Sequence, residues 1–201
     1  MAWDKLASET VVEKVSAALK SNGIETTVLN NGADALKKIN ELIPQGTEIV
    51  DMASATLDKI GFREDIASGR YTSFRQHLFA APDSEERTRL RRMSLAPKYT
   101  IGSVQAITEE GELFMVSATG SQLPAYAFGA EHVIFVVGTQ KLVKNMDEAM
   151  KRLYEYVVPL EEEAMQKKYK SHTSVNKILV IKKEVFPNRI KVLLVKENIG
   201  F

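Results

Sequence analysis

Hydrophobic and polar residues recur with two different periods along the first 60 residues. Apolar residues return every three or four positions over residues 4–21 and 33–43, which predicts two amphipathic helices. Residues 24–29 and 47–52 predict strands, and a serine cap indicates a short helix over 54–60. Strands that alternate with helices through short loops are typical of parallel β-α-β units. Ligands bind beyond the carboxyl ends of such strands.

The middle of the chain carries the strongest strand patterns. Residues 100–108 and 113–118 predict two strands joined by a turn at Gly111, which favours an antiparallel hairpin within the parallel scheme. Residues 133–137 (VIFVV) form a continuous apolar run, as is typical of a central strand buried on both faces. We therefore expect an α/β fold with a mixed, mainly parallel sheet.

The last third predicts two helices and two strands. A long helix is expected over 146–155, and Pro159 separates it from a polar helix over 161–169. Residues 177–181 and 189–195 predict strands. Their connection is too short for a crossover helix, so an antiparallel hairpin is expected.

Residues 62–92 are polar and strongly charged, unlike the segments around them. Ser84 precedes two acidic residues and predicts the start of a capped helix. Four arginines gather toward the end of this helix, at positions Arg87, Arg89, Arg91 and Arg92. They are consistent with a solvated face that complements the helix dipole, or with an arginine that binds a carboxylate or phosphate.

Composition indicates an ordinary globular domain. The 201 residues are 44% hydrophobic and 26% charged, with a net charge of +1, so no global field favours nucleic acid or a membrane surface. We expect a single domain over 1–201. The chain has no cysteine, which excludes disulfides and thiolate chemistry, and neither a signal peptide nor a spanning segment is visible. A cytoplasmic protein is expected, with Phe201 docked on the body or on a partner.

The segment that follows residues 113–118 is the leading candidate for a binding site. Thr119, Gly120, Ser121 and Gln122 connect the strand to a short helix over 122–128 that Gly129 is expected to close. A strand that breaks into such a turn can direct backbone N–H groups and two hydroxyls at a phosphate or carboxylate. The alternative is a Ser/Thr helix cap with a turn glycine, which needs no ligand.

Charged residues near this turn supply further candidates. Lys141 follows the buried strand and would lie at a carboxyl end of the sheet, where it could bind an anion, although Lys144 competes for that role. Glu109 and Glu110 lie at the Gly111 turn, and Glu109 is a candidate for a general base. An exposed lysine and solvated acids are the alternatives.

Several chemistries lack their sequence patterns. The three histidines, His77, His132 and His172, are widely spaced, so we expect no metal site. There is no GxSxG, GxGxxG or GxxxxGK[ST] pattern, so neither a nucleophile elbow nor a nucleotide loop is indicated. No cofactor is expected.

Two stretches resemble the LUD (lactate-utilisation) domain family, and the resemblance spans nearly the whole chain. They are GSVQAITEEGELFMVSATGSQLPAYAFGAEHVIFVVGTQKLVKNMDEA and the terminal RIKVLLVKENIGF. That family resembles the superfamily of ribose-5-phosphate isomerase, glucosamine-6-phosphate deaminase and CoA transferases, and ATGSQ is similar to the GTGST phosphate loop of the isomerases. The resemblance implies a three-layer α/β fold with a Rossmann-like parallel sheet and inserted antiparallel strands.

The chain also departs from these relatives. Ala118 replaces the first glycine of the isomerase loop, and the isomerase's catalytic stretches have no counterpart. Without cysteines the chain resembles the cluster-free component of a lactate-oxidation system. The resemblance therefore implies a component of lactate or organic-acid utilisation that binds a small anion at ATGSQ and works with Fe–S or flavin partner proteins. A stand-alone enzyme on a sugar phosphate or acyl-CoA, and a non-catalytic assembly or regulatory subunit, are the alternatives.

Overall fold

The computed structural model describes residues 3–51 and 53–201, with the backbone alone for Tyr169. Met52, the last residue of the predicted strand 47–52, lies outside the described residues. The helices are α1 (Glu9–Ser21), α2 (Gly32–Leu42), α3 (Ala55–Lys59), α4 (Phe62–Ala67), α5 (Phe74–Ala80), α6 (Ser84–Met93), η1 (Ala125–Gly129), η2 (Thr139–Lys141), α7 (Met146–Arg152), η3 (Leu153–Val157) and α8 (Val158–Tyr169). The strands are β1 (Glu25–Leu29), β2 (Glu48–Asp51), β3 (Thr72–Ser73), β4 (Tyr99–Gly102), β5 (Ala106–Thr108), β6 (Leu113–Ser117), β7 (His132–Gly138), β8 (Leu142–Val143), β9 (Lys177–Ile181) and β10 (Ile190–Val195).

Six strands form one parallel sheet in the order β1-β10-β7-β4-β2-β3. The apolar strand β7 lies inside it, between β10 and β4, as its continuous hydrophobic run predicts. Alternate residues of β7 face opposite sides. Val133, Phe135 and Val137 pack with α1, whereas Ile134 and Val136 pack with α2, α3 and α4.

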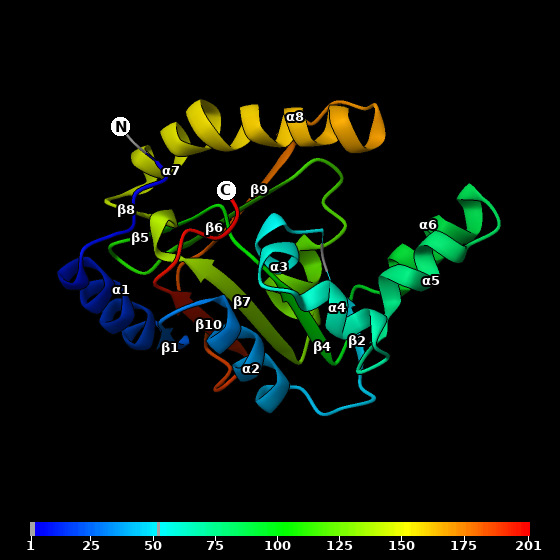
Figure 1. Ribbon diagram of the computed structural model, residues 1–201, viewed down its shortest axis with the longest axis horizontal. Helices are drawn as coiled ribbons and strands as arrows, with labels where there is room; N and C mark the ends of the chain where they lie inside the picture. Colours follow the sequence, from blue (N-terminus) through cyan, green and yellow to red (C-terminus); the bar gives the residue numbers. More distant parts are fainter. Residues whose placement is uncertain (1–2, 52) are drawn as a thin grey trace.

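The antiparallel pairs lie in a second sheet, in the order β8-β5-β6-β9. One face of this sheet joins the α1 side of the parallel sheet through Leu113 and Met115, and Phe114 on the other face packs under α7 and η3. The α/β fold with a mainly parallel sheet and additional antiparallel strands is therefore confirmed. Figure 1 shows α8 above both sheets, with α1 and α2 at the lower left.

Three strand predictions need correction. Residues 100–108 are not one strand, because β4 ends at Gly102 in the parallel sheet and β5 begins at Ala106 in the second sheet. The strands that were predicted to form one mixed sheet thus form two separate sheets. The terminal hairpin is wrong as well, since β9 pairs antiparallel with β6 while β10 runs parallel between β1 and β7. The short connection carries the chain from one sheet to the other instead of reversing it.

Helix boundaries also differ from the predictions. The first helix begins at Glu9, where the side chain of Ser8 accepts a hydrogen bond from the Val11 amide, and not at residue 4. Pro159 does not separate two helices, because α7, η3 and α8 follow one another without a break and the proline lies in the first turn of α8. Gly129 is the last residue of η1. A Cβ at this position would lie 1.9 Å from the Leu95 carbonyl oxygen.

The first part of the charged segment forms α4 and β3 in the body of the molecule, and the rest forms an arm of α5 and α6 that projects to the right in Figure 1. The predicted cap position is shifted by one residue, since Asp83 caps α6 and Ser84 is its first residue. Helix α6 buries none of its residues. The arm therefore rests on the body mainly through α5, where Phe74 is buried.

Candidate functional site

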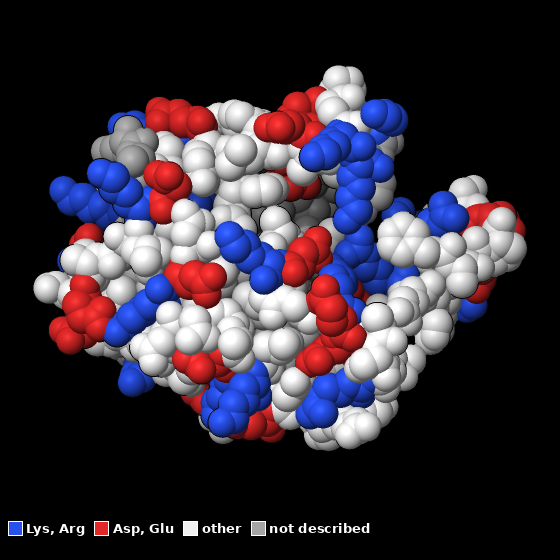
Figure 2. Space-filling model, viewed as in Figure 1, with Lys and Arg blue, Asp and Glu red and all other residues white. Residues whose placement is uncertain are grey.

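A cavity of about 630 Å³ lies beyond the carboxyl ends of β2 and β4, under α8. Its inner wall comes from α3, the link between β4 and β5, and the end of β6, and its roof comes from η3 and α8. Figure 2 shows a hollow between α8 and α3, with Lys and Arg side chains gathered along one side. This position agrees with the general location of ligand sites in open parallel sheets.

Lys141 lies at the inner end of this cavity and is only 2% exposed. Its Nζ donates hydrogen bonds to Thr56 Oγ1 at 2.9 Å, Ser103 Oγ at 3.1 Å and the Val104 carbonyl oxygen at 3.3 Å. It forms no ion pair with a carboxylate of residues 3–51 or 53–201. Burial, and to a lesser extent the charge of Arg152, lowers the pKa of Lys141 to about 7.

Arg152 is a second buried cation beside Lys141. It is 0% exposed, and its Nη1 donates to the Gln105 carbonyl oxygen at 2.6 Å. Its Nε and Nη2 are buried without a hydrogen-bond partner among the described residues. Burial lowers the pKa of Arg152 to about 10, which leaves it charged at neutral pH. Gln105 and Leu153 line the cavity, so the guanidinium lies directly behind its wall.

Two hydroxyl residues connect Lys141 to the surrounding elements. The Thr56 hydroxyl lies 3.3 Å from Ser103 Oγ and 3.2 Å from the Ile199 carbonyl oxygen. Ser103 is half-buried and lines the cavity. The Tyr126 hydroxyl also lies close by, because a Cβ on Gly102 would stand 2.2 Å from it. Gly102 is therefore required for the tyrosine to pack against the end of β4.

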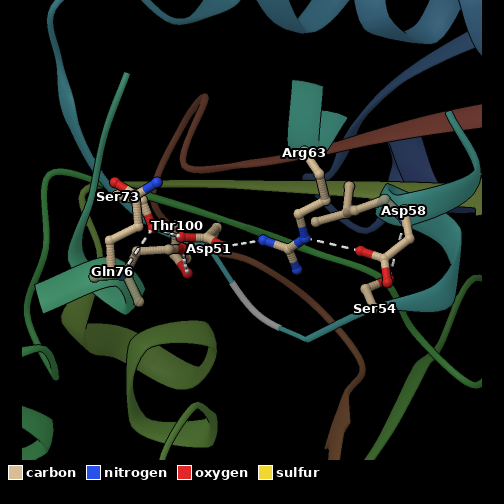
Figure 3. A network of polar contacts seen from close by, with 9 residues as sticks. Asp51, Ser54, Asp58, Arg63, Ser73, Gln76 and Thr100 are labelled. Atoms are coloured by element: carbon tan, nitrogen blue, oxygen red, sulfur yellow. Dashed lines mark hydrogen bonds and ion pairs between the residues drawn. The ribbon is translucent and has the colours of Figure 1, made fainter. Parts of the chain in front are cut away.

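A polar network beneath the cavity holds the segment that carries Thr56. Figure 3 shows Arg63 of α4 between Asp51, at the end of β2, and Asp58 of α3. Asp51 also accepts a hydrogen bond from the Ser73 hydroxyl. Because Asp51 is buried and the arginine bridges it to Asp58, helix α3 is tied to the sheet near its last residue.

The loop predicted to cradle an anion satisfies part of its own backbone. The Gly120 amide donates to Ser117 Oγ at 2.8 Å, and the Ser121 amide donates to Thr119 Oγ1 at 3.3 Å. Thr119 and Gln122 line the cavity together with Lys141, whereas Gly120 and Ser121 are not among its lining residues. The structure thus brings three of the five predicted anion-binding residues to one cavity. Two of the backbone N–H groups that were expected to bind the anion donate instead to side-chain hydroxyls of the same loop.

The other charged candidates lie elsewhere. Glu109 does not line the cavity; its carboxylate pairs with Lys14 at 2.6 Å. Lys144 is exposed and also lies outside the cavity lining. The predicted base is therefore not placed beside the predicted anion-binding residues.

Two acidic residues, Asp58 and Glu161, line the cavity together with several basic residues. Glu161 of α8 lines it, and burial raises the pKa of this carboxyl group. Arg75 and Arg91 of the arm and Lys168 of α8 also line the cavity. The wall is therefore richer in positive than in negative side chains.

Sequence reasoning missed Thr56, Ser103, Arg152 and Glu161. Thr56 and Ser103 lie on separate elements, and only the return of the chain after β7 places Lys141 between them. Arg152 follows Lys151 in the last turn of α7, and the sequence does not distinguish it from an exposed charged residue. The proximity of the short helix to the end of β4 carries no sequence pattern of its own.

The part of the chain that the structure describes contains no group of three or more Asp, Glu or His residues suited to a metal ion. Within the same residues, no helix has the length and apolar character needed to cross a membrane.

Comparisons with known proteins identify the family. A search of curated proteins found no match. The crystal structure of a DUF162 family protein from Deinococcus radiodurans is similar to this chain with a TM-score of 0.60 and 13% sequence identity, and the match covers 95% of this chain and 99% of that one. At this identity the likeness shows the fold alone. The family model of the LUD domain matches residues 12–195, so the chain belongs to the LUD domain family.

Proposed function

We propose that this protein binds a small carboxylate or phosphate anion at the inner end of the cavity, as a component of lactate or related organic-acid utilisation. The observation that supports the proposal is the pair of buried cations, Lys141 and Arg152. Neither forms an ion pair with a carboxylate in the described chain. Backbone carbonyl oxygens, and for Arg152 the Tyr156 ring centred 5.3 Å from its Cζ, offset the cost of burying these charges only in part, and a bound anion would offset more of it.

The surrounding groups suit such a ligand. Thr119, Gln122 and the Ser103 hydroxyl line the cavity and can supply neutral hydrogen bonds. Arg75 and Arg91 at the outer wall would attract an anion toward the cavity. Gly120 and Ser121 would act indirectly, because they form the loop that holds Thr119 at the cavity.

Isothermal titration calorimetry with lactate, acetate and inorganic phosphate tests the proposal. We expect Lys141→Met to weaken binding of the preferred anion by at least about 10-fold, because one charge-assisted interaction is worth roughly 1.5–3 kcal/mol. Lys144→Met, at an exposed lysine three residues away, is the matched control. Absence of binding for all three anions to the wild-type protein would contradict the proposal.

Membership of the LUD family and the absence of cysteine support a role beside redox proteins. We expect an Fe–S or flavin protein to carry out the electron transfer, because this chain has no thiolate that could bind an Fe–S cluster. Affinity purification of the tagged protein from its native cells should recover such a partner, and recovery of the chain alone would count against it.

A further inference from the structure

The buried amine lies against a hydroxyl that a ligand can reach. Lys141 Nζ is 3.1 Å from Ser103 Oγ, within the range expected for a base and the nucleophile that it activates. Ser103 lines the cavity, whereas the lysine behind it is almost completely covered. The serine is thus presented to the cavity and the lysine is shielded from water.

A third group orients the base. Thr56 Oγ1 accepts from Lys141 at 2.9 Å, and the threonine hydroxyl is itself within 3.2 Å of the Ile199 carbonyl oxygen. The Val104 carbonyl oxygen fixes the amine from another side. Nucleophile, base and orienting group therefore stand in the order found in activated-serine sites.

A donor for a developing negative charge lies beside the serine. The Tyr126 hydroxyl packs against Gly102, the residue before Ser103, and Tyr126 is one of the residues that line the cavity. Burial, followed by the negative charge of Asp51, raises the pKa of Tyr126 above its ordinary value. The phenol thus stays protonated and can donate a hydrogen bond to an oxyanion.

We propose that Ser103 is a catalytic nucleophile and Lys141 its general base, in a site that cleaves carboxylic esters whose acyl part carries a second, free carboxylate. The choice of an anionic acyl group rests on the proposed function, because that carboxylate would be held by the field of Arg152. Ester cleavage by Ser103 itself does not require that choice.

The reaction balances without a metal or a redox partner. Neutral Lys141 accepts the proton of Ser103 Oγ, which forms a bond to the acyl carbon of the ester. The carbon–oxygen bond to the leaving alcohol breaks as the Lys141 ammonium returns the proton to that oxygen. Water then cleaves the acyl-serine by the same proton path, giving a carboxylic acid and regenerating the hydroxyl. The pKa of about 7 leaves a large fraction of the amine neutral at physiological pH.

Incubation with the mono-p-nitrophenyl ester of glutaric acid tests the proposal. We expect a burst of p-nitrophenolate and an acyl group on Ser103, located by peptide mass mapping of the wild-type protein. Ser103→Ala should abolish the label, and Ser171→Ala, at another serine of the same cavity, should retain it. Label on a different residue, or none, would overturn the assignment, and mapping on the wild type does not depend on how a variant folds.

A second variant separates catalysis from binding. Lys141→Arg keeps a cation at this position but removes the base, because a guanidinium does not lose its proton. We expect acylation to fall by about 100-fold or more, with glutarate binding retained in calorimetry. In the wild type the acylation rate should rise with pH through an inflection near 7. Unchanged acylation in Lys141→Arg would refute the base. Glutarate binding without acylation of the wild type would refute this inference alone, and absence of glutarate binding would instead count against the anion site.

Discussion

Lys141 shows how burial changes the chemistry of one side chain. An exposed lysine is a permanent cation at neutral pH, whereas burial shifts its titration to about pH 7. Its three oxygen neighbours are all neutral, so they hold the amine without restoring its ordinary pKa. This combination makes Lys141 suited to bind anions when protonated and to accept protons when neutral.

The depressed pKa makes stability depend on pH. Between pH 7 and 10.5 the unfolded chain binds more protons at Lys141 than the folded one, so the free energy of unfolding rises with pH by up to about 1.4 kcal/mol per unit. In thermal melts from pH 7 to pH 9 without added anions, the wild type should gain roughly 5 °C relative to Lys141→Met. Parallel pH dependence in the two proteins would show that Lys141 titrates normally.

Glu161 opposes an anion at the same cavity. Its carboxylate lines the wall, so replacing it with the neutral isostere should strengthen binding of lactate or phosphate. We expect Glu161→Gln to raise the affinity for the anion by about 3- to 10-fold, since two like charges about 4 Å apart repel each other by roughly 1 kcal/mol in water. Glu163→Gln, at an exposed glutamate of the same helix, is the control. An equal gain in both variants would mean that only net charge matters.

Among the elements, the break between β4 and β5 creates the site. The chain leaves the parallel sheet at Gly102 and enters the second sheet at Ala106, and the residues between them carry Ser103 and the Val104 carbonyl. The sequence pattern predicts one strand over residues 100–108. The two halves of this segment pair with strands of two different sheets, and this pairing breaks the predicted strand. Local periodicity does not specify which distant strand a segment pairs with.

The terminal segment closes the inner end of the site. Ile199 is fully buried, and Gly200 adopts a φ of +67° with a would-be Cβ 2.3 Å from Thr56 Oγ1. Phe201 packs partly buried against the α7–η3 core and lines the cavity, in line with the expected docking on the body. This segment therefore holds the threonine that orients Lys141.

Gly200→Ala should disturb this contact. The substitution introduces both an unfavourable positive φ and a collision with backbone and side chain of Thr56, so we expect a loss of several degrees in melting temperature and weaker anion binding. Gly46→Ala is a matched control, because Gly46 also has a positive φ of +79° but has nothing within 4 Å of a Cβ. Equal losses in the two variants would show that the backbone angle, and not the contact with Thr56, sets the cost.

At the scale of the whole molecule, stability is unevenly distributed. Strand β7 is buried along nearly its whole length between β10 and β4, whereas α6 buries no residue. Regions with few buried contacts open without global unfolding. The arm that supplies Arg91 to the cavity wall is therefore the least anchored part of the site.

Hydrogen exchange followed by mass spectrometry can measure this difference. We expect amides of α6 to exchange orders of magnitude faster than those of β7 and β10, because the arm opens at a small fraction of the global free energy. Amides of α1, which buries Val12, Val15 and Leu19, serve as a helical control. Protection of α6 equal to that of α1 would show that the arm is held as firmly as the body.

The sequence by itself determined the alternation of helices and strands, the central buried strand and the α/β class, because burial of one or both faces leaves a period in the residues. It also placed Lys141 at a carboxyl end of the sheet. Only the tertiary structure decided that residues 100–108 and the last two strands divide between two sheets. It also placed Glu109 apart from the cavity and brought Thr56, Ser103 and Arg152 to Lys141. These contacts join segments up to 85 positions apart in the chain, and no local pattern encodes which distant segments meet.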